Sequence, residues 1–301
     1  MKKRFLCAVM AFLFVFSAAG CGAAVKVNDA DTQAVRAAVE KFAACKSFSV
    51  KQLTDSTEVA VSEGTEYKYV GSKSVEISVI NGDEFQMSTV TETEVKAEEG
   101  TVEHSTASYI VPEGKGYTEY FSDGDQWYKL STEDASILPA IDARVFAGSF
   151  YVDALGFGMA GEDTLDSGKA LRYEGRLEGQ ELIDMLEGIG YFAGTIGSMS
   201  ENQQAKIKEN LVKDLGAVTV KVWVDEASGY PVKFEVSLTD MLKDLEKSIT
   251  KTLGDKDVSE WSITEYVISM SAGDFDELSE IMLPEEAKGA VVYDTAAGVA
   301  Q

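Results

Sequence analysis

Hydrophobic and polar positions alternate most strictly in two segments late in the chain. Apolar residues fill every second position of both segments, namely Val218, Val220, Val222 and Val224, then Val232, Phe234, Val236 and Leu238. Residues 226–229 between them have the composition of a turn. Because strand side chains alternate between two faces, the pattern predicts two neighbouring strands with one dry face.

A looser alternation predicts an antiparallel meander in the first half. Apolar residues alternate over residues 75–79 and again at Phe85 and Met87, and the Asn81-Gly82 pair between them is typical of a hairpin turn. Further strands are predicted at residues 101–111, 116–121, 126–130, 169–177 and 258–271.

Between these strands, a few segments have apolar residues at helical spacing. Thr32 is expected to cap a helix that extends to Cys45, because Val35, Val39 and Phe42 recur at helical spacing. Further helices are predicted within residues 132–157, at 182–189, at 201–215 and after a cap at Thr239.

Strands outnumber helices and do not alternate with them one by one, which argues against a parallel doubly wound sheet. The order predicts an α+β fold, in which helices cover the concave face of a single large curved antiparallel sheet, an unclosed half-barrel. No linker rich in Pro, Gly or Ser divides the chain. We therefore expect one half-barrel domain at residues 32–272 and a loosely held acidic C-terminal tail at residues 273–301.

The first twenty residues have the order of an export signal. Lys2, Lys3 and Arg4 precede an unbroken apolar run at residues 5–16, and small residues follow at 17–20. The run is shorter than the roughly 20 apolar residues that span a bilayer. We expect residues 1–20 to be a signal peptide and residues 21–31 to be a tether.

The signal ends in Ala18-Ala19-Gly20-Cys21, which resembles the lipobox of bacterial lipoproteins, although Ala18 stands where that motif usually has Leu. The resemblance implies cleavage after Gly20 and a diacylglyceryl group on the Cys21 thiol. Two acyl chains suffice for stable anchoring. The protein would then lie on the extracytoplasmic face of the cell membrane, or on the outer membrane of a two-membrane host, because Gly22 is not Asp. The alternative is a plain secretory signal with an incidental cysteine.

Charge and cysteine content narrow the possible partners. The chain has 27 basic and 51 acidic residues, and loss of the signal leaves a net charge of −27. Nucleic acid and anionic headgroups would be repelled. Acidic residues are spread along the chain, which favours a solvated exterior over a cation-binding surface. Cys45 is the one cysteine left after Cys7 is removed and Cys21 is lipidated, so no intramolecular disulfide forms.

Catalytic motifs are not found in the sequence. His104 is the single histidine, and the Ser-x-x-Lys spacing at residues 248–251 lacks its companion motifs. Asp274, Asp276 and Glu280 resemble a calcium loop but lack its glycine. We expect no enzyme, no metal and no cofactor. Four aromatic residues could line a glycan or lipid site or serve as strand formers: Trp127, Tyr128, Trp223 and Tyr230.

The clearest pair of strands carries a family resemblance. Val222-Trp223-Val224-Asp225 followed by Gly229-Tyr230-Pro231-Val232-Lys233, with the lipobox and the helix-then-meander order, resembles the lipoprotein-carrier superfamily. That superfamily includes LolA-like and LolB-like proteins and mycobacterial lipid-binding lipoproteins. The motif covers about a dozen residues, and the order of elements covers most of the mature chain.

The resemblance implies a membrane-anchored lipoprotein that binds a hydrophobic ligand or the lipid moiety of another molecule. A curved sheet covered by helices leaves a cavity suited to acyl chains. Candidate lining residues are Phe85, Met87, Val220, Val222, Phe234 and Val236. The same residues could instead form a filled core, because alternation identifies the dry face and not whether it is hollow. In that case the protein would be an interaction or sensor lipoprotein without a small-molecule ligand.

Overall fold

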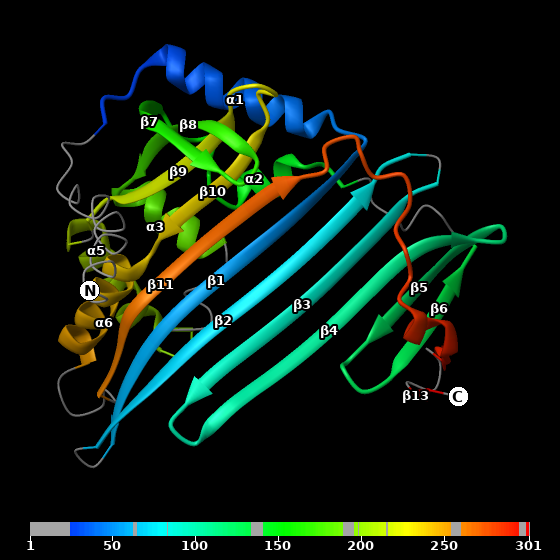
Figure 1. Ribbon diagram of the computed structural model, residues 1–301. Helices are drawn as coiled ribbons and strands as arrows, with labels where there is room; N and C mark the ends of the chain where they lie inside the picture. The colour runs from blue at the N-terminus through cyan, green and yellow to red at the C-terminus, as the bar shows by residue number, and fades with distance from the viewer. Residues whose placement is uncertain are drawn as a thin grey trace, which may run out of the picture.

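The computed structural model describes residues 25–62, 65–82, 84–133, 141–188, 196–197, 199–214, 216–253, 260–294 and 299–300 (Figure 1). The elements in the first half are α1 (Asp29–Ala43), β1 (Ser47–Ser62), β2 (Thr65–Ile80), β3 (Gln86–Ala97), β4 (Gly100–Glu113), β5 (Gly116–Ser122) and β6 (Trp127–Thr132). Those in the second half are α2 (Arg144–Gly148), β7 (Phe157–Leu165), β8 (Gly168–Leu177), α3 (Gly179–Gly188), α5 (Glu201–Asp214), β9 (Val218–Asp225), β10 (Pro231–Ser237), α6 (Thr239–Leu253), β11 (Glu260–Gly273), the 3₁₀ helix η2 (Glu285–Gly289), β12 (Val291–Asp294) and β13 (Val299–Ala300). The predicted signal peptide and Cys21 lie outside the described residues.

The described strands form one sheet in the order β13-β12-β6-β5-β4-β3-β2-β1-β11-β10-β9-β8-β7. Two consecutive meanders, β1–β6 and β7–β11, are joined where β1 pairs antiparallel with β11. Neighbours are antiparallel except β12, which lies parallel to β6. The two ends of the order do not pair, so the sheet is unclosed, and the predicted α+β half-barrel is confirmed (Figure 1).

The alternation of β9 and β10 produces a buried inner face as predicted, although Trp223 and Val232 are also buried, in a separate small cluster. Phe234 pairs with Val222 and Val236 pairs with Val220, and all four side chains belong to the main core. Lys221 pairs with Glu235 on the opposite, outer face. We call the face that carries Val222 the inner face.

Register shifts interrupt three of the strand pairs. The register shifts at Met159/Gly161 between β7 and β8, at Pro231/Lys233 between β9 and β10, and at Thr57/Glu58 between β1 and β11. An extra residue in one strand bends it and increases its twist.

Helices cover this concave side through their apolar faces. Buried residues of α1, α2, α3, α5 and α6 join the inner-face residues in a single core cluster. The predicted cap of α1 is wrong by four residues, because the Asn28 side chain, rather than Thr32, accepts a hydrogen bond from the backbone N–H of Asp31 at 2.9 Å. Thr239 is the first residue of α6, and its hydroxyl accepts from the backbone N–H of Tyr266 at 2.9 Å.

Other predictions differ from the structure where sequence patterns are mixed. β1 and β7 were not predicted, and α2 is a short helix within the longer helical region expected at residues 132–157, part of which lies outside the described residues. Asn81-Gly82 does not form a two-residue hairpin turn. Instead, the Asn81 amide donates to the carbonyl of Ile141 at 2.9 Å, and the β2–β3 connection extends to Phe85.

The described part of the segment after Gly273 is not the loosely held tail that we expected. Residues 274–290, which we call the C-terminal strap, cross the outer face from β11 toward β6 (Figure 1). The backbone N–H groups of Asp276 and Ile281 donate to the Ser47 carbonyl at 2.8 Å and to the Gln86 side chain at 2.9 Å. The sequence pattern does not reveal these partners because they come from distant strands.

Candidate ligand-binding site

The inner face changes from apolar to polar across the sheet. One row of paired residues runs from Val222 on β9 through Phe234 and Met270, and continues to Gln52 on β1. It then passes Val75 on β2 and reaches Thr91 on β3. The buried apolar part of this row is therefore on β9, β10 and β11, whereas another row carries Phe48, Val79 and Met87 into the same core.

Four of the six predicted lining residues form one block. Val220, Val222 and Phe234 are at most 1% exposed, and Val236 completes the block on β10. Phe85 and Met87 lie at β3, with β2, β1 and β11 between them and β10. All six nevertheless contact the same core cluster. Their role as the lining of a cavity stays a prediction.

Helical side chains cover this block directly. Phe150, which follows α2, stacks on Phe234 with ring centroids 5.4 Å apart. The buried apolar residues of α6 are Met241, Leu242 and Leu245, and those of α3 and α5 are Leu182, Ile183, Leu186, Ile207 and Leu211. Apart from a few side-chain hydrogen bonds, such as that of Thr239 with Tyr266, the described contacts between these helices and the sheet are apolar.

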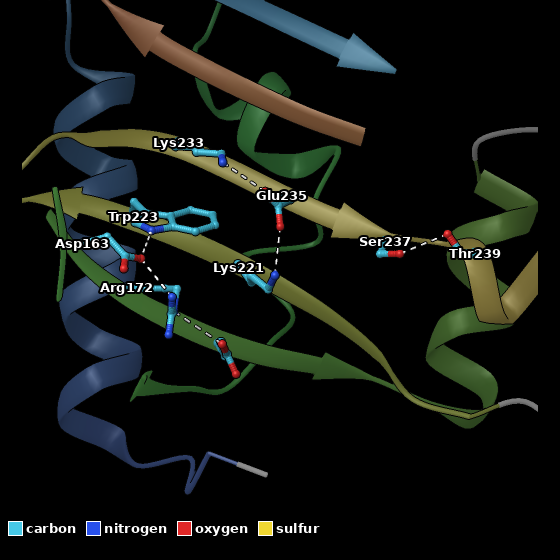
Figure 2. Close-up of polar contacts among 9 residues, drawn as sticks. Asp163, Arg172, Lys221, Trp223, Lys233, Glu235, Ser237 and Thr239 are labelled. Atoms are coloured by element: carbon cyan, nitrogen blue, oxygen red, sulfur yellow. Dashed lines mark hydrogen bonds and ion pairs between the residues drawn. The ribbon is translucent and has the colours of Figure 1, made fainter. Parts of the chain in front are cut away.

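The outer face of the same strands carries a polar network beside a small apolar cluster of Ala170, Trp223 and Val232 (Figure 2). The Trp223 indole N–H donates to Oδ2 of Asp163 at 2.7 Å, and the Arg172 guanidinium donates to the same oxygen at 2.9 Å. The Lys233 ammonium lies 4.6 Å from the centroid of the Trp223 ring. Trp223 therefore has a structural role on the outer face, where it cannot line the inner core.

Two lysines complete this outer network by contacting Glu235. Nζ of Lys221 lies 2.9 Å from one carboxylate oxygen, and Nζ of Lys233 lies 3.0 Å from the other (Figure 2). Burial alone would favour the neutral carboxyl, but the two ammonium groups outweigh it and lower the pKa of Glu235. Within this network of described residues, Arg172, Lys221 and Lys233 each lie within 4.0 Å of a carboxylate.

The other predicted aromatic residues do not gather at one site. Tyr230 stacks on Phe275 with centroids 4.2 Å apart, whereas Tyr128 stacks on Phe121 with centroids 5.5 Å apart. Trp127 contacts Tyr109. Trp127 and Tyr128 lie in β6, as the interpretation as strand formers predicts, whereas Tyr230 precedes β10.

A polar groove of about 660 Å³ opens on the outer face beside the β5–β6 turn. Its lining residues are Ser72, Ser74, Glu92, Thr93, Glu94, Glu103, His104, Ser105, Asp123, Gly124 and Asp125. Within the described ranges, no group of His, Cys, Asp or Glu side chains is placed to hold a metal ion. We do not assign a ligand to this groove.

The calcium-like residues have another function in the structure. The Ser49 hydroxyl donates to Oδ2 of Asp274 at 2.5 Å, and the backbone N–H of Lys46 donates to Oδ1 of Asp276 at 2.6 Å. The Asp274 and Asp276 side chains thus fasten the start of the C-terminal strap to β1. Ser248 of the Ser-x-x-Lys spacing is buried on α6, and the side chains of residues 249–251 lie outside the described residues.

Sequence reasoning missed a buried polar contact at the end of α1. Cys45 is 5% exposed, and its thiol donates to the Lys41 carbonyl over 3.7 Å. Burial raises the pKa of this thiol, while a hydrogen bond with Cys45 and burial raise the pKa of Tyr230 to about 12. Because both groups are neutral at physiological pH, the contact is structural rather than reactive.

A second missed feature is a pair of acidic residues between α6 and the sheet. Burial raises the pKa of Glu58, and burial together with the charge of Glu58 raises the pKa of Glu246. Burial also raises the pKa of the adjacent Tyr266, while Lys243 opposes the shift of Glu246. The Glu246 carboxylate accepts a hydrogen bond from the backbone N–H of Ile263 at 3.2 Å.

Glu246→Gln is expected to stabilise the protein at pH 7 and to have little effect near pH 4. The pKa of Glu246 in the folded chain lies above the unfolded value of about 4.3, so the folded chain binds this proton more tightly than the unfolded chain does. The resulting stabilisation is present below that value and is lost as the pH rises through the folded-state pKa. Urea unfolding across this pH range measures the difference.

Asp225→Asn is a control for which the opposite change in stability at pH 7 is expected. Hydrogen bonds from Ser228 lower the pKa of Asp225, and the backbone N–H of Ser228 lies 2.6 Å from Oδ1. This carboxylate contributes stability above its unfolded pKa, and that contribution is lost on acidification. The variant should therefore be destabilised at pH 7. The same pH dependence in both variants would contradict the assignment of the acidic pair.

The geometry defines a class of protein: an open, curved antiparallel sheet whose apolar inner face is covered by helices. No family model matches the chain, and no curated protein matches it. Among the helices of the described chain, none combines the length and apolar character of a membrane span.

Solved structures of bacterial lipoproteins resemble this fold. The chain is 13% identical to LprF from Mycobacterium bovis, with a TM-score of 0.40 over 86% of this chain and 98% of that one. It is 10% identical to the lipoprotein LppX from Mycobacterium tuberculosis, with a TM-score of 0.35 over 84% and 98% of the two chains. A domain from Vibrio parahaemolyticus described as an outer membrane lipoprotein-sorting protein is 8% identical, with a TM-score of 0.23 over 83% and 94%. The likeness concerns the fold alone.

Proposed function

We propose that this protein is an extracytoplasmic lipoprotein, anchored through Cys21, that binds a hydrophobic ligand or the lipid moiety of another molecule between sheet and helices. The signal and the Cys21 motif support the anchor. The anchor places the protein on the cell membrane, or on the outer membrane where the host has two. The role is binding rather than catalysis.

One observation carries the binding proposal. Helices, rather than a second sheet, cover the apolar inner face of β9, β10 and β11. The backbone hydrogen bonds of a helix are internal, so helices can move away from the sheet without breaking the strand ladder. An acyl chain could then replace helical side chains such as Met241 and Leu242 against Val222 and Phe234, with little loss of apolar contact.

A filled-core interaction or sensor lipoprotein is the alternative. It is favoured by the complete burial of Val222 and Phe234, whose side chains are 0% exposed under the present arrangement of helices. Such a core needs no ligand to be stable, and the protein would then act through its surface.

Native mass spectrometry of the mature chain carrying Cys21→Ser distinguishes the two functions. We expect a population with one or more bound lipids after purification from a bacterial envelope extract. Val222→Trp places a large ring on the inner face and should remove the bound lipid. Lys221→Trp, on the outer face of the same strand, should retain it.

Absence of lipid from the unsubstituted domain and both tryptophan variants would favour the filled core. In that case Val222→Trp should also destabilise the domain, because an already filled core has no space for the ring.

A further inference from the structure

The described chain begins with a segment that is fixed against the edge strand β7. The backbone N–H of Asn28 donates to the Phe157 carbonyl at 3.0 Å, and the backbone N–H of Met159 donates to Oδ2 of Asp31 at 2.8 Å. A Cβ atom at Gly158 would lie 2.4 Å from the Lys26 carbonyl oxygen, so glycine is needed for this approach. Residues 25–28 therefore belong to the folded body, although we expected a tether through residue 31.

The predicted lipid site is consequently very close to the domain. Four Cα–Cα steps separate Cys21 from Val25. A fully extended chain spans at most about 3.5 Å per residue, which gives a reach of roughly 14 Å. By contrast, the 16 residues of β1 extend roughly 54 Å at about 3.4 Å per residue. If Cys21 carries the lipid, the corner formed by residues 25–28 and the start of β7 must lie at the bilayer.

Two large apolar side chains are exposed at this corner. Val27 is 47% exposed and Met159 is 53% exposed. Val27 lies against Gly156, and the backbone N–H of Met159 donates to Asp31, so both residues belong to the region where residues 25–31 meet the start of β7. Isolated apolar residues are common on protein surfaces. Here, however, the pair lies where the chain would emerge from the membrane.

We propose that Val27 and Met159 contact the lipid bilayer, so that the domain rests on the membrane by this corner. The inference depends on the proposed lipid anchor. Two side chains bind a bilayer weakly by themselves, but tethering makes the second contact intramolecular and raises its effective concentration. The net charge of −27 of the mature chain opposes electrostatic binding to anionic lipid, so the contact is apolar and suits a zwitterionic surface.

Site-specific fluorescence on the full lipidated chain tests this contact. A Cys45→Ala background leaves Cys21 as the remaining cysteine of the mature protein, with its thiol blocked by lipid. Met159→Cys and Val27→Cys each accept an environment-sensitive probe, and Val102→Cys on β4 is the control, because Val102 is 70% exposed and distant along the sheet order. The labelled proteins are bound to phosphatidylcholine vesicles that contain a spin-labelled quencher lipid.

We expect the probes at residues 27 and 159 to be quenched at least twofold more than the probe at residue 102, with blue-shifted emission. Equal quenching at all three positions, on protein that floats with the vesicles, would overturn the bilayer contact and leave the anchor intact. A chain that carries no lipid and does not float would overturn the anchor and the contact together.

Discussion

Cys21→Ser is expected to abolish the incorporation of labelled fatty acid and to release the protein from the membrane fraction, or to leave its signal uncut. The serine hydroxyl cannot form the thioether through which the predicted diacylglyceryl group is attached. Without acyl chains, the mature domain loses an anchor that stabilises membrane binding by about 0.8 kcal/mol per buried CH₂. Metabolic labelling with fatty acid followed by membrane fractionation measures both effects.

Cys45→Ser is the matched control for this experiment. Cys45 is buried in the folded domain and should not be lipidated. Labelling in this variant should therefore equal that of the unsubstituted chain. Persistent labelling of the Cys21→Ser chain would show that Cys21 is not the lipid site, and the alternative of a plain secretory signal would then apply.

Phe234→Ala is expected to lower the free energy of unfolding by roughly 3–5 kcal/mol. Phe234 is 0% exposed, stacks on Phe150 and pairs with Val222 at the centre of the inner face. Its truncation removes buried apolar surface and leaves a void. Chemical unfolding with urea measures the change.

Lys221→Ala, on the outer face of the neighbouring strand, is the control. The Lys221 side chain is 37% exposed, and Glu235 keeps its contact with Lys233 when Lys221 is removed. The expected loss is about 1 kcal/mol or less. A loss at Phe234 near the low end of its range would favour an interior that is already hollow, whereas equal losses at the two positions would contradict the assignment of the inner face.

The sequence predicted the sheet best where one face is dry and the other is wet. Alternation in β9 and β10 identified the inner-face residues because a one-residue shift would move every valine to the outer face. β1 was missed because its inner positions change from Phe48 and Val50 to Gln52 and Thr54, which removes the contrast between the two faces. β7 was missed because Gly156, Gly158 and Gly161 resemble a loop in sequence.

The candidate site was only partly predictable for a related reason. Local alternation is enough to place Val222 and Phe234 on the same face of the sheet, where they are paired. The helices that cover these residues, and the partners of the C-terminal strap, depend on contacts between distant segments. The acidic pair of Glu58 and Glu246 is of this kind, because the two residues come from β1 and α6 and have no shared motif.

The pairing of β1 with β11 has a consequence for the order of folding. Val50 and Ala272 are paired although 222 residues separate them. Closing so long a loop costs roughly 5 kcal/mol of chain entropy before other contacts offset it, and folding slows when contacts are this distant in sequence. The central pair of strands therefore forms only after almost the whole chain has been synthesised. Until then β1 can pair with β2 but has no partner on its other side, so the two halves of the sheet are joined late in folding.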